Sequence, residues 1–82
     1  MEQRLGSILI LVDAKDDVAK MNAIISDYSQ LIIGRQGISM RDKNKSIISL
    51  VLEGTTDELG ALSGKLGKLK GIRVKSIVTK NN

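Results

Sequence analysis

The spacing of the apolar residues changes repeatedly along this chain, and these changes limit the folds that it can adopt. Residues 4–12 and 46–53 are short, nearly continuous apolar runs, RLGSILILV and SIISLVLE, which predict the central strands of a sheet. The first run is continuous enough to predict a strand that is covered on both sides. Residues 30–40, which contain two glycines, and residues 72–79, in which charged and apolar residues alternate, predict edge strands.

Two intervening segments have the spacing of three and four residues that is typical of amphipathic helices. The first apolar stripe consists of Ala14, Val18, Met21, Ile25 and Tyr28. The second consists of Leu59, Leu62, Leu66 and Leu69. We expect Asp13 to cap the first helix. Thr55 and Glu58 match a capping box for the second helix, and Gly71 is placed as its C-terminal stop.

The predicted order of elements is strand, helix, strand, strand, helix, strand. This order is typical of the α+β class and of the ferredoxin-like βαββαβ sandwich, in which a four-stranded antiparallel sheet carries both helices on one face. A chain of 82 residues is too short to bury two separate cores, so we expect residues 1–82 to form a single domain.

This fold leaves one face of the sheet without a cover. The inward residues of the two central strands are Ile8, Ile10, Val12, Ile48, Leu50 and Leu52. Strand alternation then sends four more aliphatic residues to the opposite face, namely Leu9, Leu11, Ile47 and Val51. An apolar patch of this kind is typical of an interface. We therefore predict a homodimer or homotetramer, assembled through this face or through an edge strand.

Three glycines of the second predicted helix fall on one side of it. Gly60, Gly64 and Gly67 are spaced four and three residues apart. Each internal glycine costs about 1 kcal/mol relative to alanine. Two interpretations remain open: a partner backbone or a ligand approaches this side closely, or a well-capped helix simply tolerates the glycines.

The composition excludes most familiar active sites. The chain has no histidine and no cysteine, so imidazole bases, thiolate nucleophiles and the usual ligands of zinc and iron–sulfur centres are absent. No pair of the remaining polar residues has a spacing that indicates catalysis. We predict no enzymatic activity, no cofactor and no metal. Tyr28 is the single aromatic residue, and no motif for docking on nucleic acid is present.

The charge is unevenly distributed along the chain. Residues 1–61 contain 7 basic and 9 acidic residues, whereas residues 62–82 contain 6 basic residues and no acidic one. This basic segment is either an anion-binding or acidic-partner surface or a solvated rim. No apolar run has the length of a membrane span, and the start Met-Glu-Gln-Arg lacks a signal-peptide pattern, so we expect a cytoplasmic protein without a membrane partner.

One segment has the residue types that bind small anions. Gly34 and Gly37 open the backbone around Arg35, and Arg41 follows closely. Guanidinium groups suit carboxylates and phosphates, so these four residues are the candidate ligand contacts. An edge strand protected by charge and glycine explains the same residues nearly as well.

The segments GRQGI and SIISLVLEGTTDELGALSGKLGKLKGIRVKS, together with the opening strand, resemble the family of small regulators of the iron-only hydrogenase system. That family is ACT-like and is similar to the C-terminal, effector-binding domain of the nickel-responsive repressor. The resemblance covers essentially the whole chain. It implies a ferredoxin-like ACT-type fold, an oligomer, and a regulatory role linked to hydrogenase maturation, without an established ligand or reaction.

The sequence departs from these relatives in two respects. The nickel site of the repressor is built from His and Cys, which this chain lacks, so that metal function does not carry over. Amino-acid-binding ACT domains typically have a Pro-Gly turn after the first strand, where this chain has Asp13-Ala14-Lys15-Asp16. The leading hypothesis is a non-enzymatic, homo-oligomeric sensor of a small anionic effector. The alternative is an accessory factor that docks on a hydrogenase maturation protein through its basic C-terminal third.

Overall fold

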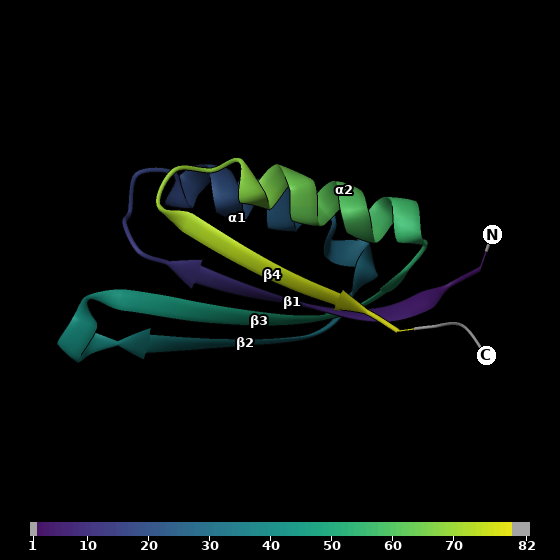
Figure 1. The fold of residues 1–82 in the computed structure, drawn as a ribbon, viewed down its shortest axis with the longest axis horizontal. Helices are drawn as coiled ribbons and strands as arrows, with labels where there is room; N and C mark the ends of the chain where they lie inside the picture. The colour runs from purple at the N-terminus through teal and green to yellow at the C-terminus, as the bar shows by residue number, and fades with distance from the viewer. Residues whose placement is uncertain (1, 80–82) are drawn as a thin grey trace.

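A four-stranded antiparallel sheet carries two helices on one of its faces, in a computed structural model that describes residues 2–79 (Figure 1). The strands and helices are β1 (Arg4–Val12), α1 (Val18–Asp27), β2 (Ile32–Met40), β3 (Lys45–Gly54), α2 (Thr56–Gly67) and β4 (Ile72–Val78). Two short 3₁₀ helices, η1 (Ser29–Leu31) and η2 (Arg41–Lys43), flank β2. The strand order is β2-β3-β1-β4, which confirms the predicted ferredoxin-like arrangement with the two most apolar strands at the centre.

The core lies between the sheet and the helices. Every residue predicted to point inward from the central strands is buried, as are Leu59, Leu62 and Leu66 of α2. Met21 and Ile25 of α1 are buried against them. Because the 2-residue period of the strands and the 3.6-residue period of the helices both select these positions, the sequence pattern was sufficient to place the core.

The first helix begins later than predicted. It starts at Val18, and the preceding residue, Asp17, makes no side-chain capping hydrogen bond. The prediction that Asp13 caps this helix was therefore wrong. The backbone N–H groups of Asp13 and Ala14 instead donate to the carbonyl oxygen of Gly71, at 2.8 and 3.2 Å. The segment between β1 and α1 therefore first lies against the turn that precedes β4.

The second helix begins as predicted. The Thr55 hydroxyl accepts from the backbone N–H of Glu58 at 3.1 Å, and Oε1 of Glu58 accepts from the backbone N–H of Thr55 at 2.9 Å. This confirms the capping box. The helix ends at Gly67, four residues before the predicted stop. Gly71 has a φ of +77° and forms the turn into β4.

No helix in residues 2–79 is long and apolar enough to cross a membrane.

Figure 1 shows both helices on the same side of the sheet, while the opposite side carries no element of the described chain. The turn between β2 and β3 extends beyond the helical layer along the long axis of the molecule (Figure 1).

Candidate functional site

The side of the sheet away from the helices presents a group of large aliphatic side chains. In the register of β1 with its neighbours, Leu11 lies opposite Ile47 and Ser7 lies opposite Val51. Seven aliphatic residues share this side, and we call them the open face: Leu5, Leu9, Leu11, Ile38, Ile47, Val51 and Ile77. Leu9 is 41% exposed and Val51 is 45% exposed. The two central strands are therefore covered on one side only within this chain.

Charged residues border one end of the open face. Nε of Arg73 lies 2.6 Å from Oδ2 of Asp13, and Nζ of Lys45 lies 3.3 Å from its Oδ1. The hydrogen bond from Arg73, assisted by Lys45, holds the pKa of the Asp13 carboxyl below its ordinary value. One acidic group thus faces two basic groups, which leaves this end of the face with a net positive charge.

Acidic residues far away in the sequence partly offset the basic C-terminal third. The backbone N–H of Lys70 donates to Oδ2 of Asp17 at 2.7 Å, and Nζ of Lys70 lies 3.7 Å from Asp16. Lys65 lies over the ring of Tyr28, with Nζ 5.0 Å from the ring centroid. Lys70 and Arg73 are thus paired with acidic side chains, which reduces the excess of positive charge in this segment.

The four candidate ligand contacts do not come together. Gly34 lies opposite Val51 and thus on the side of the open face, whereas Arg35 and Gly37 lie on the helical side, opposite the buried Leu50 and Ile48. Strand alternation separates Gly34 from Arg35, and a register shift between Ile32 and Gly34 decides which side each of them takes. Arg41 belongs to η2, outside the strand.

On the helical side, Arg35 borders a polar hollow of about 500 Å³. Its lining consists of Asn22, Ile25, Ser26, Ser29, Ile32 and Arg35. A second hollow, of about 430 Å³, lies beside it and is mostly apolar. Its lining consists of Val12, Lys15, Val18, Met21, Asn22, Ser46 and Ile48. Asn22 lines both, so the two hollows adjoin along α1.

Sequence reasoning missed the polar wall of this site, although a signal was present. Asn22 and Ser26 are four residues apart on one side of α1, and Ser29 follows three residues later, in η1. They stand next to the apolar stripe that contains Ile25. A polar row that directly borders a buried row marks the edge of a helix, where it can line a groove against the sheet.

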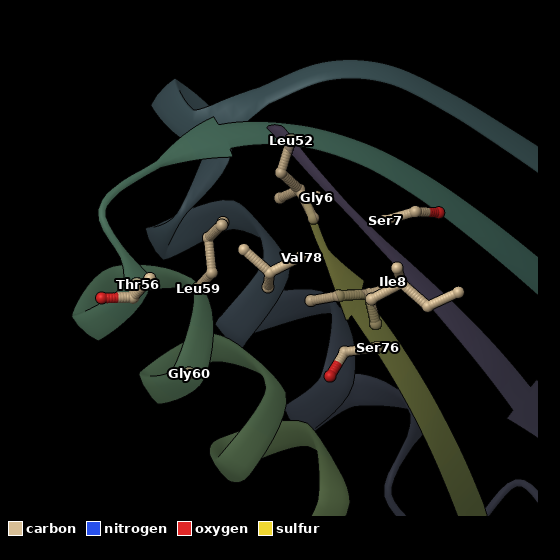
Figure 2. A pocket seen from close by; sticks show the side chains of 10 residues that line it. Gly6, Ser7, Ile8, Leu52, Thr56, Leu59, Gly60, Ser76 and Val78 are labelled. Atoms are coloured by element: carbon tan, nitrogen blue, oxygen red, sulfur yellow. The ribbon is translucent and has the colours of Figure 1, made fainter. Parts of the chain in front are cut away.

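A smaller cavity lies where β1 and β4 meet the first turns of α2 (Figure 2). Its volume is about 80 Å³, and Figure 2 shows the side chains of Leu59, Ile8 and Val78 around it. Pockets that enclose small molecules usually have volumes of 300 Å³ or more. This cavity is thus too small for a metabolite and reflects imperfect packing at the end of the sheet.

The glycine row of α2 faces open space in the structure of residues 2–79. A Cβ atom added at Gly60, Gly64 or Gly67 would meet no atom within 4 Å. All three are exposed. Close packing within the described chain therefore does not explain these glycines.

Within residues 2–79, no cluster of three or more acidic side chains is placed to hold a metal ion.

Comparison with known proteins identifies the family. The sequence profile of the TM1266-like family, described as "Iron-only hydrogenase system regulator, putative", matches residues 4–76. The chain belongs to this family. The solved structure of the uncharacterized protein TM1266 from Thermotoga maritima is similar to this TM1266-like chain, with a TM-score of 0.90 and 39% sequence identity. The match covers 96% of this chain and 100% of that one. No curated protein matches the sequence.

The region shared with the TM1266-like family contains nearly all of the features described above. It starts at Arg4, the first residue of β1, and ends at Ser76, close to the end of β4. Both adjoining hollows and six of the seven open-face residues lie within it, Ile77 being the exception. In this TM1266-like chain, these are the two surfaces on which function can be argued.

Proposed function

We propose that this chain is a non-enzymatic regulatory module of the iron-only hydrogenase system, which works as an ACT-like homo-oligomer and senses a small anionic molecule. Membership of a family of regulators supports the regulatory role. The observation that carries the oligomer is the open face, because an isolated subunit would leave its leucines, isoleucines and valine partly in contact with water.

Burial of the open face would stabilise an assembly substantially. A fully buried aliphatic side chain contributes about 1.5–3 kcal/mol relative to an exposed one. Five members of the open face are between 41% and 72% exposed, Ile77 being the most exposed. Covering them would contribute on the order of 5 kcal/mol per subunit, before the entropic cost of association is subtracted.

The charges at the two ends of the open face suit a two-fold arrangement. Asp13 with Arg73 and Lys45 leaves one end positive, and Glu53, opposite Leu5, places a negative charge at the other end. Lys75, opposite Leu9, adds a positive charge between the two ends. In a two-fold symmetric stack of two sheets with opposite strand directions, the positive end of each copy faces the negative end of the other. A second copy of this chain is therefore a complementary occupant.

Light scattering at micromolar protein concentration tests the assembly. We expect the mass of a dimer or a tetramer for the native chain. Val51→Glu places an acidic group in the middle of the open face and should give a monomer. Ala23→Glu makes the same charge change on the exposed side of α1 and should keep the native mass. A monomeric native chain, or a Val51→Glu variant of native mass, contradicts the proposal.

The glycine row provides a second surface for assembly. If a partner backbone packs against Gly60, Gly64 and Gly67, Gly64→Leu should reduce the mass of the assembly, for example from tetramer to dimer. If Gly64→Leu has the same mass as the native chain, the open face alone is responsible for assembly. The fold of the subunit should tolerate this substitution, since the space around Gly64 is open.

The ion pairs of the basic C-terminal third favour the sensing function over the alternative, in which this segment docks on a maturation protein. Lys70 and Arg73 are engaged by acidic residues of the same chain, so fewer positive groups are free for a partner. A thermal-shift screen separates the two functions. Stabilisation by a small anion supports sensing, whereas stabilisation only by a maturation protein supports docking.

A further inference from the structure

We propose that the two adjoining hollows along α1 bind a monocarboxylate with an aliphatic body. This inference rests on the proposed sensing function and names the chemical class of its ligand. The carboxylate would occupy the polar hollow beside Arg35. The aliphatic part would pass Asn22 and occupy the apolar hollow.

The polar hollow has donors and no competing acid. Arg35 supplies a planar guanidinium group, which matches a carboxylate with two parallel hydrogen bonds. The hydroxyl groups of Ser26 and Ser29 and the amide of Asn22 add further donors. No carboxylate lines the hollow, and Arg35 forms no ion pair with any acidic residue in the described range 2–79. Its positive charge is therefore available to an anion.

The apolar hollow suits a hydrocarbon rather than a second charged group. Val12, Val18, Met21 and Ile48 supply most of its lining, and Met21 and Val12 are almost fully buried. Lys15, which has no carboxylate partner in the part of the chain described here, closes the far end and can extend its ammonium group into water. An aliphatic chain here would replace water at the edge of the core.

The two hollows form one elongated site. From Val18 to Asp27, α1 is about 14 Å long at 1.5 Å per residue, and Ser29 lies just beyond its end. A purely polar anion would leave the apolar half unused, whereas a neutral hydrocarbon would leave the Arg35 charge unpaired. An amphipathic anion satisfies both halves, which is the charge and polarity match that singles out this ligand class.

Both hollows lie along the edge of α1, where it faces the sheet. The buried side chains of α1 belong to the core. The polar hollow reaches Ile32 and Arg35 of β2, and the apolar hollow reaches Ser46 and Ile48 of β3.

Calorimetry with sodium octanoate tests the proposal on the full chain. Octanoate should bind with an affinity at least about tenfold higher than acetate, which lacks the aliphatic body, and than 1-octanol, which lacks the charge. Arg35→Gln should reduce octanoate affinity at least about tenfold, by loss of the charge-assisted hydrogen bonds. Arg4→Gln is the matched control, because Arg4 lines neither hollow, and it should bind as the native chain does.

The amide spectrum locates the binding site. Octanoate should shift the NMR signals of residues 18–35, and leave those of Leu9, Val51 and Ile77 in place. Equal octanoate affinity in the native and Arg35→Gln proteins, or shifts confined to the open face, would overturn the proposal. The mass of Arg35→Gln should equal that of the native chain, so failure of the ligand site and failure of the assembly can be told apart.

Discussion

Arg73 donates two hydrogen bonds to the carboxylate of Asp13, from Nε at 2.6 Å and from Nη2 at 3.1 Å. This pair joins the start of β4 to the residue that follows β1, across 60 positions of sequence. Lys45, the first residue of β3, reaches the same carboxylate. Three strands of the sheet are thus connected through one acidic group at the edge of the open face.

The Asp13 carboxylate makes stability depend on pH. Its pKa is lower in the folded chain than in the unfolded chain, because Arg73 and Lys45 favour the charged form. Its contribution is therefore present above the unfolded value, near 3.8, and is lost as the pH falls through the lowered folded value. Asp13→Asn should be less stable than the native chain in urea at pH 7, and this difference should disappear in strong acid. Asp42→Asn is the control, and a difference that persists in acid contradicts the assignment.

The capping box should have a measurable effect on stability. Thr55→Ala removes the hydroxyl that accepts from the Glu58 backbone, at a nearly buried position. We expect the free energy of unfolding to fall by about 1 kcal/mol. Thr56→Ala, in the first turn of the same helix, tests the loss of a hydroxyl without a capping role and should change stability little. Urea denaturation followed by circular dichroism measures both, and equal effects would contradict the cap.

Gly71 is a position where a side chain should not fit. Its φ is +77°, and an added Cβ would lie 2.9 Å from both Cβ and the carbonyl oxygen of Ala14. Gly71→Ala should therefore reduce the free energy of unfolding by more than about 1 kcal/mol. Gly37→Ala has no atom within 4 Å of the added group and serves as the matched control. Its stability should equal or exceed that of the native chain.

The glycine row of α2 should allow stabilisation. Gly64→Ala adds a methyl group in open space and limits the freedom of the unfolded chain. We expect the free energy of unfolding to rise by about 0.4–1 kcal/mol, measured by urea denaturation at a fixed protein concentration. A loss of stability would mean that another copy packs closely against this side of the helix.

The parts of the fold that depend on one local sequence pattern could be predicted from the sequence. Alternation along the central strands was enough to place Leu9 and Val51 on the side away from the helices, and the spacing of Thr55 and Glu58 was enough to identify the cap. In both cases the interacting positions lie close together in the sequence, so that their relative placement depends only on the period of one element.

The side of the sheet on which the candidate contacts of β2 lie did not follow from the sequence, because it depends on a bulge. An extra residue in β2, beside Ile33, decides that Arg35 points to the helical side, and no sequence signal marks where such a residue is accommodated. Likewise, Asp13 matches a helix cap locally but lies beside Arg73 in space. A residue that matches a local motif does not form the predicted contact when a residue distant in sequence is a stronger partner, here the charged Arg73.

The central position of β1 has a consequence for damage to the chain. Its second neighbour is β4, which is also the last strand described. Proteolytic removal of Ile72–Val78 would turn an inner strand into a new border with unpaired N–H and C=O groups, next to leucines that already contact water. Such a border is a template for edge-to-edge strand pairing, so clipping at this end should promote aggregation of the chain.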